Sequence, residues 1–99
     1  KGIDDLKKMA EESLKSVRNC IIALSDNDID FAEKVIKEEE RVDNLEKQIR
    51  GEHMQRLTSG ECNPRVGVIF LDALTNLERV SDHALNVAQG VIGANTTKN

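Results

Sequence analysis

Hydrophobic residues along the chain recur at steps of three and four in three long segments. This spacing lines one face of an α-helix with apolar side chains, whereas strands would alternate at every second residue. The first segment predicts a helix over about residues 3–25 with core positions Ile3, Leu6, Ala10, Leu14, Val17, Ile21 and Leu24. The second predicts a helix over about residues 27–58 with core positions Phe31, Val35, Val42, Leu45, Ile49 and Leu57.

The third segment predicts a helix over about residues 64–91. Its apolar set is the broadest of the three and comprises Val66, Ile69, Phe70, Leu74, Leu77, Val80, Ala84, Val87 and Val91. A helix that is apolar over a wide arc is expected to be covered by its neighbours. We therefore expect the third helix to be the most buried of the three.

Residues with special backbone preferences mark the helix ends. Ser25-Asp26-Asn27-Asp28 matches the S-x-x-[DE] capping pattern, which predicts a helix start there. Gly60 suits the left-handed conformation that ends a helix, and Asn63-Pro64 suits an N-cap followed by a first helical residue. Because short connections between long helices favour antiparallel packing, we expect an all-α, up-down-up three-helix bundle. It would occupy residues 1–92, with a flexible tail over residues 93–99.

Composition excludes several classes of function. The chain has 99 residues, which is one domain, and a formal net charge of −4. It has no Trp, no Tyr and two Phe, so it lacks both the basic surface and the aromatic stacking platform of a nucleic-acid binder. Its two cysteines form no C-x-x-C pair, which favours a reducing, cytoplasmic setting.

Two acidic pairs interrupt the helical pattern. Glu39 and Asp43 lie four residues apart in the second predicted helix, and Glu78 and Asp82 repeat that spacing in the third. Residues four apart share a helix face, where like charges cost a few tenths of a kcal/mol. Both pairs lie about equally far from the turn near Glu61, so antiparallel packing would bring the four carboxylates to one level. Clustered carboxylates are ligands for hard cations, so these four residues are candidate metal ligands.

The alternative interpretation is a solvated charged face. Nearby cationic side chains could pair with the acidic residues for little net energy, and the candidates are Arg41, Lys47, Arg56 and Arg79. Glu38, Glu39 and Glu40 are consecutive, so the pattern leaves open which of them faces the neighbouring helix. Glu46 shares a similar face and is either a supporting ligand or a surface charge.

The two histidines do not predict an enzyme. A ferritin-like di-iron oxidase needs Glu-x-x-His on two helices, but Arg50 stands three residues before His53 and Val80 three residues before His83. We predict that His53 is a surface residue and that His83 supports either the metal ligands or helix packing rather than binding a metal itself. Nucleophile elbows and glycine-rich phosphate loops are also absent from the sequence. Catalysis is therefore not expected.

The segment from Thr75 to Ala88 (TNLERVSDHALNVA) closely resembles the N-L-E-R-[IV]-x-D-H-x-x-N-[IV]-A signature of PhoU-like domains. Upstream, Glu39-x-x-Val42-Asp43-x-Leu45-Glu46 resembles the first acidic motif of that family. Together with Gly60-Glu61-Cys62 and Phe70-Leu71-Asp72, the signature is most similar to PhoU-like cytoplasmic domains fused to sodium/phosphate cotransporter-related membrane proteins. The resemblance covers about residues 3–92.

The resemblance implies a fold, a cofactor and a role. PhoU-like domains are three-helix bundles, and their acidic motifs bind multinuclear clusters of iron or zinc. Matched motif by motif, the ligands here are Glu39, Asp43, Glu78 and Asp82. The family regulates bacterial phosphate uptake and phosphate-starvation signalling through contacts with a transporter and a sensor kinase. Full-length PhoU proteins contain two repeats, so the resemblance implies pairing with a second repeat or another copy of the chain. A structural adaptor or dimerisation module without metal is the competing hypothesis.

Overall fold

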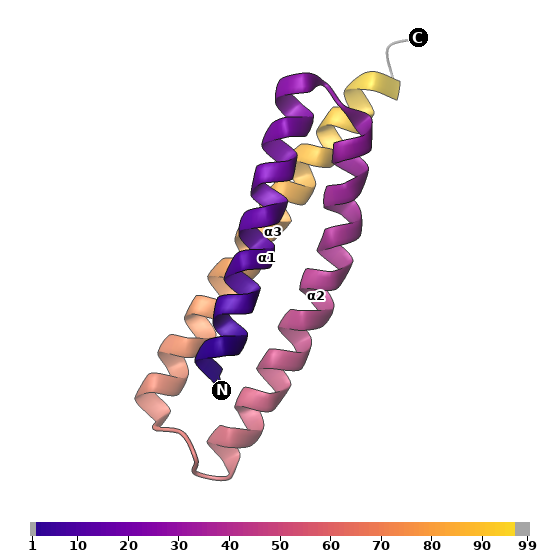
Figure 1. Cartoon of the computed structure of the whole chain (residues 1–99). Helices are drawn as coiled ribbons and strands as arrows, with labels where there is room; N and C mark the ends of the chain where they lie inside the picture. Colours follow the sequence, from indigo (N-terminus) through magenta and orange to yellow (C-terminus); the bar gives the residue numbers. More distant parts are fainter. Residues whose placement is uncertain (1, 97–99) are drawn as a thin grey trace.

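The computed structural model describes residues 2–96 of the chain, and these residues form three long helices (Figure 1). Helix α1 spans Gly2–Asp26, α2 spans Ile29–Thr58 and α3 spans Pro64–Thr96. Each helix packs against both others in an up-down-up bundle, so α1 and α3 run parallel and α2 runs antiparallel to them. The predicted all-α three-helix bundle is confirmed.

The turn between α1 and α2 differs from the predicted capping pattern. Asn27 adopts a left-handed conformation, with φ of 53°. Asp28 is the N-cap of α2, and its carboxylate accepts hydrogen bonds from the backbone amides of Asp30 and Phe31. Ser25 still lies within α1, so α2 begins at Ile29 rather than residue 27. The aspartate is preferred because its charged carboxylate is the stronger acceptor at a helix N-terminus.

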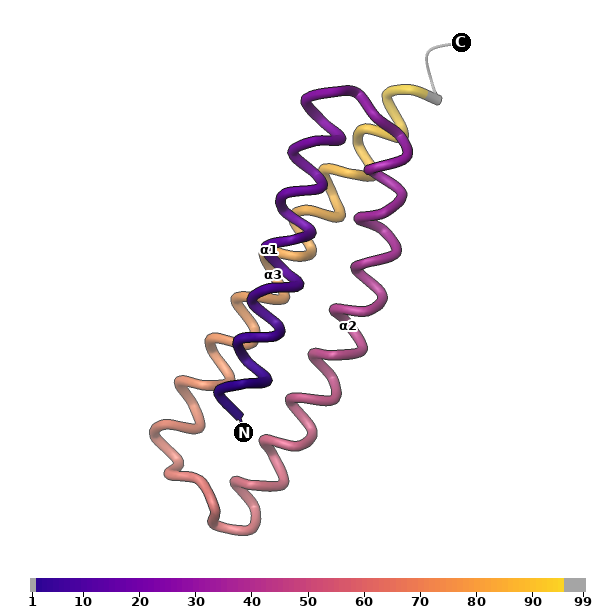
Figure 2. The backbone as a smooth tube through the Cα atoms, viewed as in Figure 1, coloured from indigo at the N-terminus to yellow at the C-terminus, as the bar shows by residue number. Residues whose placement is uncertain are grey.

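The connection between α2 and α3 follows the sequence prediction. Gly60 has φ of 78°, the left-handed conformation that glycine adopts without strain. The Asn63 side chain accepts a hydrogen bond from the amide of Arg65 at 2.9 Å, and Pro64 is the first residue of α3. Figure 2 shows this connection at the same end of the bundle as the N-terminus of α1. The opposite end holds the α1–α2 turn and the C-terminal part of α3.

Helix α3 continues beyond its predicted end at residue 91. It takes in residues 93–96 of the predicted tail, while residues 97–99 lie outside the described part of the chain. The Asn95 side chain exchanges hydrogen bonds of 2.7 and 2.9 Å with Asn27 and also donates to the carbonyl of Val91. These bonds tie the last turn of α3 to the α1–α2 turn. Such a tertiary contact is not visible in the local sequence.

The core consists of two apolar clusters, one in each half of the bundle. The cluster nearer the α1–α2 turn comprises Cys20, Ala23, Ala32, Val35, Ala84, Ala88 and Val91. The cluster nearer the α2–α3 connection comprises Met9, Val42, Ile49, Phe70 and Leu74. Buried Ser13, Ser16 and Ser81 contribute small polar side chains from α1 and α3. Alanine and serine are abundant in this core because small side chains let the helix backbones approach closely.

The buried face of α1 is not the predicted one. Its buried residues are Met9, Ser13, Ser16, Cys20 and Ala23. Several residues predicted as core are instead more than half exposed, namely Ile3, Leu14, Ile21 and Leu24. The prediction was wrong because α1 carries two low-polarity faces, and the larger aliphatic side chains lie on the one that α2 and α3 leave uncovered.

Helix α3 is likewise not buried all round. Phe70, Leu74, Ala84 and Val91 are buried as predicted. The structure instead exposes four of the predicted core residues, Val66, Ile69, Val80 and Val87. The breadth of the apolar pattern therefore reflects two surfaces, one facing the core and one facing outward. No helix within the described residues has an apolar stretch long enough to cross a membrane.

Candidate metal centre

The antiparallel register of α2 and α3 brings the two acidic pairs to the same level. Ser81 of α3 donates a hydrogen bond to Glu39 Oε2 of α2 at 2.8 Å. Since Ser81 directly precedes Asp82, this bond aligns the two acidic motifs. Near this level of the bundle, the buried side chains of α1 and α3 include Ser13, Ser16 and Ser81, and their small size lets the helices approach closely. The four predicted residues therefore gather along one helix–helix seam.

A first group of carboxylates lies where Asp43 and Glu46 of α2 meet Glu78 of α3. Each of the three offers one carboxylate oxygen, and these oxygens all lie within 4.8 Å of one another. Asp43 and Glu78 are half-buried and Glu46 is buried. Oxygens this close could converge on one cation, since Ca²⁺ ligand distances are 2.3–2.6 Å and those of transition metals are shorter.

The second group contains the other two predicted residues, Glu39 and Asp82. Their side chains are close enough to share a hydrogen bond, and Ser81 holds the remaining side of Glu39. Charge on Asp43 and Asp82 also acts on both Glu39 and Glu78, which links the two groups electrostatically. The four predicted carboxylates thus form one continuous acidic seam, which Glu46 extends.

The structure settles which of three consecutive glutamates faces α3. Glu39 points to α3 and contacts Ser81. Glu38 points to α1, where the Asn19 amide donates to both of its oxygens at 3.1 Å and Lys15 lies 3.8 Å away. Glu40 is exposed. The helical rotation of 100° per residue therefore gives the three side chains three different environments.

Glu46 was left open by the sequence and proves to belong to the seam. It forms an ion pair with Arg50, one turn later in α2, through Nε of the guanidinium. The Arg50 Nη2 donates to Thr75 Oγ1 on α3 at 3.1 Å. The sequence analysis did not assign Arg50 or Thr75 to the acidic site. Glu46 stands three residues after Asp43, which is the spacing that could have identified it.

Cationic side chains compensate this seam only in part. Lys47 lies 3.3 Å from Asp43, but that lysine is largely exposed. Arg41 pairs instead with Glu12 of α1 at 3.4 Å. Five carboxylates therefore meet one partly buried guanidinium and one exposed ammonium, so the seam carries an excess of negative charge.

Burial, together with the excess negative charge, raises the pKa values of two carboxylates in the seam. Burial is the main cause that raises the pKa of Glu39 to about 7, and the neighbouring charges of Asp82 and Asp43 raise it further. The hydrogen bond donated by Ser81 lowers this pKa but does not cancel the increase. Burial also raises the pKa of Glu78, and the charges of Glu46, Asp82 and Asp43 add to the effect. Both shifts mean that the folded chain disfavours full ionisation of the seam. A bound cation would remove that penalty.

The stability of chelator-treated protein is expected to fall as the pH rises from about 5 to 8. Glu39 has an ordinary pKa of 4.5 and a folded-state pKa of about 7, so between these values the native state binds more protons than the unfolded state. Stability therefore declines with pH across this window, and Glu78 acts in the same direction. Thermal unfolding at several pH values in EDTA measures the slope. Glu39→Gln should flatten it, and an unchanged slope would contradict the assignment.

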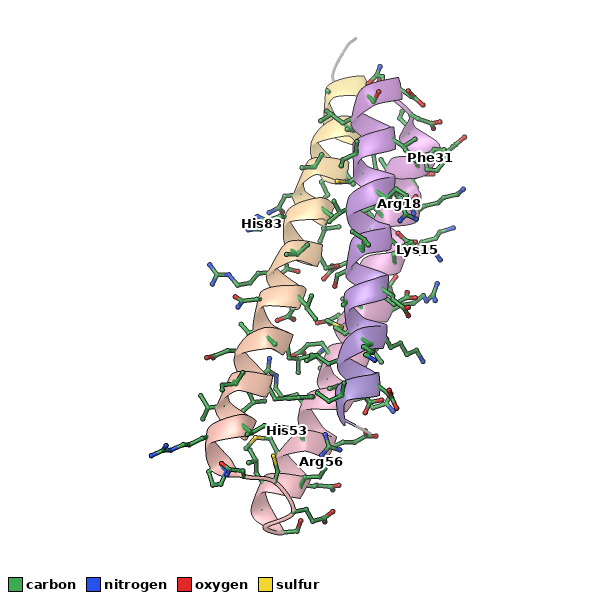
Figure 3. All side chains as sticks on the ribbon, turned by 60° about the vertical axis from the view of Figure 1, so that its left-hand side comes forward. Lys15, Arg18, Phe31, His53, Arg56 and His83 are labelled. Atoms are coloured by element: carbon green, nitrogen blue, oxygen red, sulfur yellow. The ribbon has the colours of Figure 1, made fainter. Side chains whose placement is uncertain are left out.

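Both histidines differ from their predicted environments. His53 is buried at 2% exposure, its ring stacks on Phe70 at 4.1 Å, and Nε2 lies 3.2 Å from the carbonyl of Gly67. It is therefore a packing residue near the α2–α3 connection rather than a surface residue. His83 is exposed and points away from the bundle (Figure 3). It does not support helix packing, because the α3 face that carries it is turned away from α1 and α2.

The fold and the acidic seam define a class of protein, a three-helix bundle with an E-x-x-x-D motif on each of two adjacent helices. A model of the PhoU domain family matches residues 6–91. The chain therefore belongs to the PhoU domain family.

Several full-length proteins are similar to this chain. It is 32% identical over 97 residues to phosphate-specific transport system accessory protein PhoU homolog 1 of Thermotoga maritima, covering 98% of the chain and 42% of that protein. It is 28% identical over 100 residues to the PhoU homolog of Clostridium acetobutylicum, covering 95% of the chain and 45% of the relative. It is also 29% identical over 87 residues to the PhoU homolog of Xylella fastidiosa, covering 88% of the chain and 37% of that protein. The chain spans less than half the length of these relatives. No solved structure matched the chain.

Proposed function

We propose that this chain is a non-enzymatic, metal-binding regulatory domain that serves bacterial phosphate transport or phosphate-starvation signalling. The observation that carries the proposal is the convergence of Asp43, Glu46 and Glu78 oxygens within 4.8 Å across the α2–α3 seam. The names of the relatives, accessory proteins of phosphate-specific transport systems, support the biological setting.

The donor set fits a transition-metal cluster. Glu39, Asp43, Glu78 and Asp82 would supply oxygen ligands from both helices, with Glu46 as a further ligand. Carboxylates bind iron and zinc as well as harder cations, and their spread along the seam suits more than one ion. We therefore propose iron or zinc, bound as a multinuclear cluster. Bound cations would supply positive charge that favours the ionised carboxylates, and so would oppose the effects that raise the pKa values of Glu39 and Glu78.

The residues around the seam would hold the ligands in position. Ser81 fixes one oxygen of Glu39, and Arg50 fixes one oxygen of Glu46 while Thr75 orients the guanidinium. Such supporting hydrogen bonds orient metal ligands and restrict their rotation. Coordination from both helices would lock the spacing of α2 and α3. The proposed regulatory output is a surface whose shape depends on that spacing.

The proposed partners are a second PhoU-like unit, either a repeat or another copy of the chain, and a membrane transporter or sensor kinase. The relatives are more than twice as long as the chain, which leaves room for a second unit of this size. Cys20 and Cys62 are both free thiols, which supports a cytoplasmic location. The motifs around Gly60 and Phe70 support attachment to a sodium/phosphate cotransporter-related membrane protein.

A structural adaptor or dimerisation module without metal is the second candidate. The observation that favours it is the set of large aliphatic side chains exposed on α1 and α3, including Leu14, Ile21 and Val80. These residues lie away from the acidic seam and could bind a partner whatever the metal content. Metal analysis separates the two candidates.

Plasma mass spectrometry on untagged protein purified without chelator tests the proposal. Near-stoichiometric iron or zinc per chain is the expected result. Glu78→Ala combined with Asp82→Ala should abolish metal retention. Mutation of a residue that only supports a metal ligand typically lowers metal affinity by roughly 10–100-fold, and removal of two ligands should lower it further. The variant should stay helical, since it removes repulsion from the seam.

The matched control combines Glu40→Ala with Asp72→Ala. Both residues are exposed, one on α2 and one on α3, and the pair changes the net charge by the same amount. It should retain the full metal content. Folded wild-type protein that contains no metal and takes up none would overturn the metal proposal in favour of the adaptor. Full metal content in the Glu78/Asp82 variant would show that the site lies elsewhere.

A further inference from the structure

A small pocket lies at the end of the bundle that holds the α2–α3 connection. It has a volume of about 200 Å³, and all three helices line it, through Gly2, Ile3, His53, Arg56, Val66 and Phe70. Ile3 and Val66 are more than half exposed at its rim, whereas His53 and Phe70 are almost fully buried. A largely apolar pocket with a few polar groups is typical of a site for a small organic ligand.

The first polar group in the pocket is the imidazole of His53. Its Nε2 lies 3.2 Å from the carbonyl oxygen of Gly67, and a carbonyl oxygen can only accept a hydrogen bond. Nε2 therefore carries the hydrogen in the neutral ring, which leaves a lone pair on Nδ1. Nδ1 is buried and has no hydrogen-bond partner in the range 2–96. Because an unpaired buried acceptor is unfavourable, this atom favours a ligand that donates a hydrogen bond.

Close helix packing holds the His53 ring in this orientation. A Cβ atom added at Gly67 would lie 2.5 Å from Cδ2 of Leu57 and 3.3 Å from Nε2 of His53. Glycine therefore allows α3 to approach α2 closely enough for the hydrogen bond to Nε2. On its face, the ring stacks on Phe70 with 4.1 Å between the ring centroids. These contacts fix which nitrogen of His53 is left without a partner.

The second polar group is the guanidinium of Arg56, three residues after His53 in α2. Its Nη2 is buried without a hydrogen-bond partner, and Arg56 forms no ion pair with another residue in the range 2–96. A Cβ atom added at Gly2 would lie 3.0 Å from this nitrogen, so glycine leaves room beside the guanidinium. Figure 3 labels both side chains near the α2–α3 connection. Since arginine is always charged, an unpaired Nη2 favours a carboxylate or another anion.

The carboxylates of the chain near this pocket leave Arg56 without an ion-pair partner. Glu61 lines the pocket, but it is exposed and accepts a hydrogen bond of 2.7 Å from the Ser59 hydroxyl. Asp5 lies three residues after Gly2 in α1, and its buried Oδ2 has no hydrogen-bond partner within the described residues. It also forms no ion pair with Arg56. The position beside the guanidinium is therefore open to a carboxylate from outside the chain.

The Arg56 side chain also provides a route to the buried atoms. Arg56 and Glu61 line a second, more polar hollow of about 490 Å³, so Arg56 lies between the two spaces. The outer part of a long arginine side chain can change rotamer without moving the helix. A turn of Arg56 towards the polar hollow would open the inner pocket to solvent and expose the guanidinium to an entering anion.

We propose that this pocket binds a small organic acid that carries a hydroxyl group, such as a 2-hydroxy carboxylic acid. The carboxylate pairs with Arg56, the hydroxyl donates a hydrogen bond to Nδ1 of His53, and the hydrocarbon part contacts Phe70. Inorganic phosphate fits less well because it has no apolar part to cover the pocket wall. The inference goes beyond the proposed function and does not require metal, because Glu46, the nearest seam residue in α2, lies about two turns before His53.

NMR titration of the 15N-labelled chain with racemic 2-hydroxy-3-methylbutanoate tests the proposal, in EDTA so that no metal binds the acid. We expect saturable shifts of the amide signals around the pocket. The analogue 3-methylbutanoate lacks only the hydroxyl and should bind at least about tenfold more weakly, because it leaves Nδ1 unpaired. Inorganic phosphate should also bind more weakly than the hydroxy acid. No saturable shifts with the hydroxy acid, or equal affinity for either comparison ligand, would overturn the proposal.

Arg56→Met tests the contact with the carboxylate. The variant keeps a long apolar side chain but removes the charge, so it should bind the hydroxy acid about tenfold or more weakly than the wild type. Arg65→Met is the matched control, because Arg65 is exposed near the same end of the bundle and the net charge changes equally. It should bind like the wild type. Unchanged affinity in Arg56→Met would place the acid elsewhere and contradict the assignment.

His53→Phe tests the contact with the hydroxyl. Phenylalanine keeps an aromatic ring against Phe70 but has no acceptor, so the variant should bind the two acids with similar affinity. A general loss of stability would not remove this preference selectively. The 15N shifts of the wild-type His53 ring give a second test, which does not depend on the variant folding. Hydrogen on Nε2 is the expected result, whereas hydrogen on Nδ1, or a retained preference in His53→Phe, would overturn the assigned contact.

Discussion

Adding iron(II) or zinc to chelator-treated protein at pH 8 is expected to raise the melting temperature by more than about 10 °C. At this pH the Glu39 carboxylate, whose pKa is raised to about 7, is ionised at a cost, and the raised pKa of Glu78 acts in the same direction. A ligand that binds only the folded state at 100 times its Kd stabilises by about 2.7 kcal/mol. Each kcal/mol shifts the melting temperature of a domain of this size by roughly 4–8 °C.

The control for this shift is the Glu78→Ala, Asp82→Ala variant, titrated with the same metals. It should melt within about 2 °C of its metal-free form, because half of the predicted ligands are missing. Without metal, the variant should be at least as stable as the wild type at pH 8, since fewer carboxylates repel one another. An equal shift in both proteins would place the stabilising metal outside the acidic seam.

Leu74→Ala is expected to destabilise the protein by about 2–5 kcal/mol. Leu74 has no exposed surface and lies in the apolar cluster nearer the α2–α3 connection. Its removal leaves a cavity beside Met9, Val42 and Ile49, which the rigid helices fill only in part. Because a small domain has only about 5–15 kcal/mol of stability, this is a large loss. Urea unfolding followed by circular dichroism gives the free energy directly.

Met54→Ala provides the comparison for the cavity variant. It removes a side chain of similar size, but Met54 is 48% exposed on α2 and belongs to neither core cluster. The change should alter the free energy of unfolding by no more than about 0.5 kcal/mol. If both variants lost stability equally, the core assignment near Leu74 would be wrong.

The three helices were predictable because their signals are local. Steps of three and four between apolar residues, Gly60 at a left-handed position and Asn63-Pro64 at a helix start each act within a few residues. The antiparallel register followed from the short α2–α3 connection, and it brought the Glu39 and Glu78 pairs to one level. These parts of the fold and of the candidate site needed no knowledge of distant contacts.

The faces of the helices were less predictable, because periodicity locates an apolar stripe without saying what covers it. On α1 the largest aliphatic residues, such as Leu14 and Ile21, are exposed, while Ser13 and Ser16 are buried. His53 is polar in sequence but buried against Phe70. In both cases, the distance between the helices and the shapes of the neighbouring side chains decide which residue is buried, and the polarity of the residue itself matters less.

The sequence by itself determined the helical class, the number of helices, the α2–α3 turn and the acidic pairs. It did so because hydrogen bonding within a helix and apolar periodicity depend on neighbours in the chain. Only the tertiary structure decided that Glu39 rather than Glu38 faces α3, that Glu46 and Arg50 join the seam, and that the α1–α3 side remains apolar and exposed. These properties depend on the rotation of each helix about its axis, which is set by packing across the whole bundle.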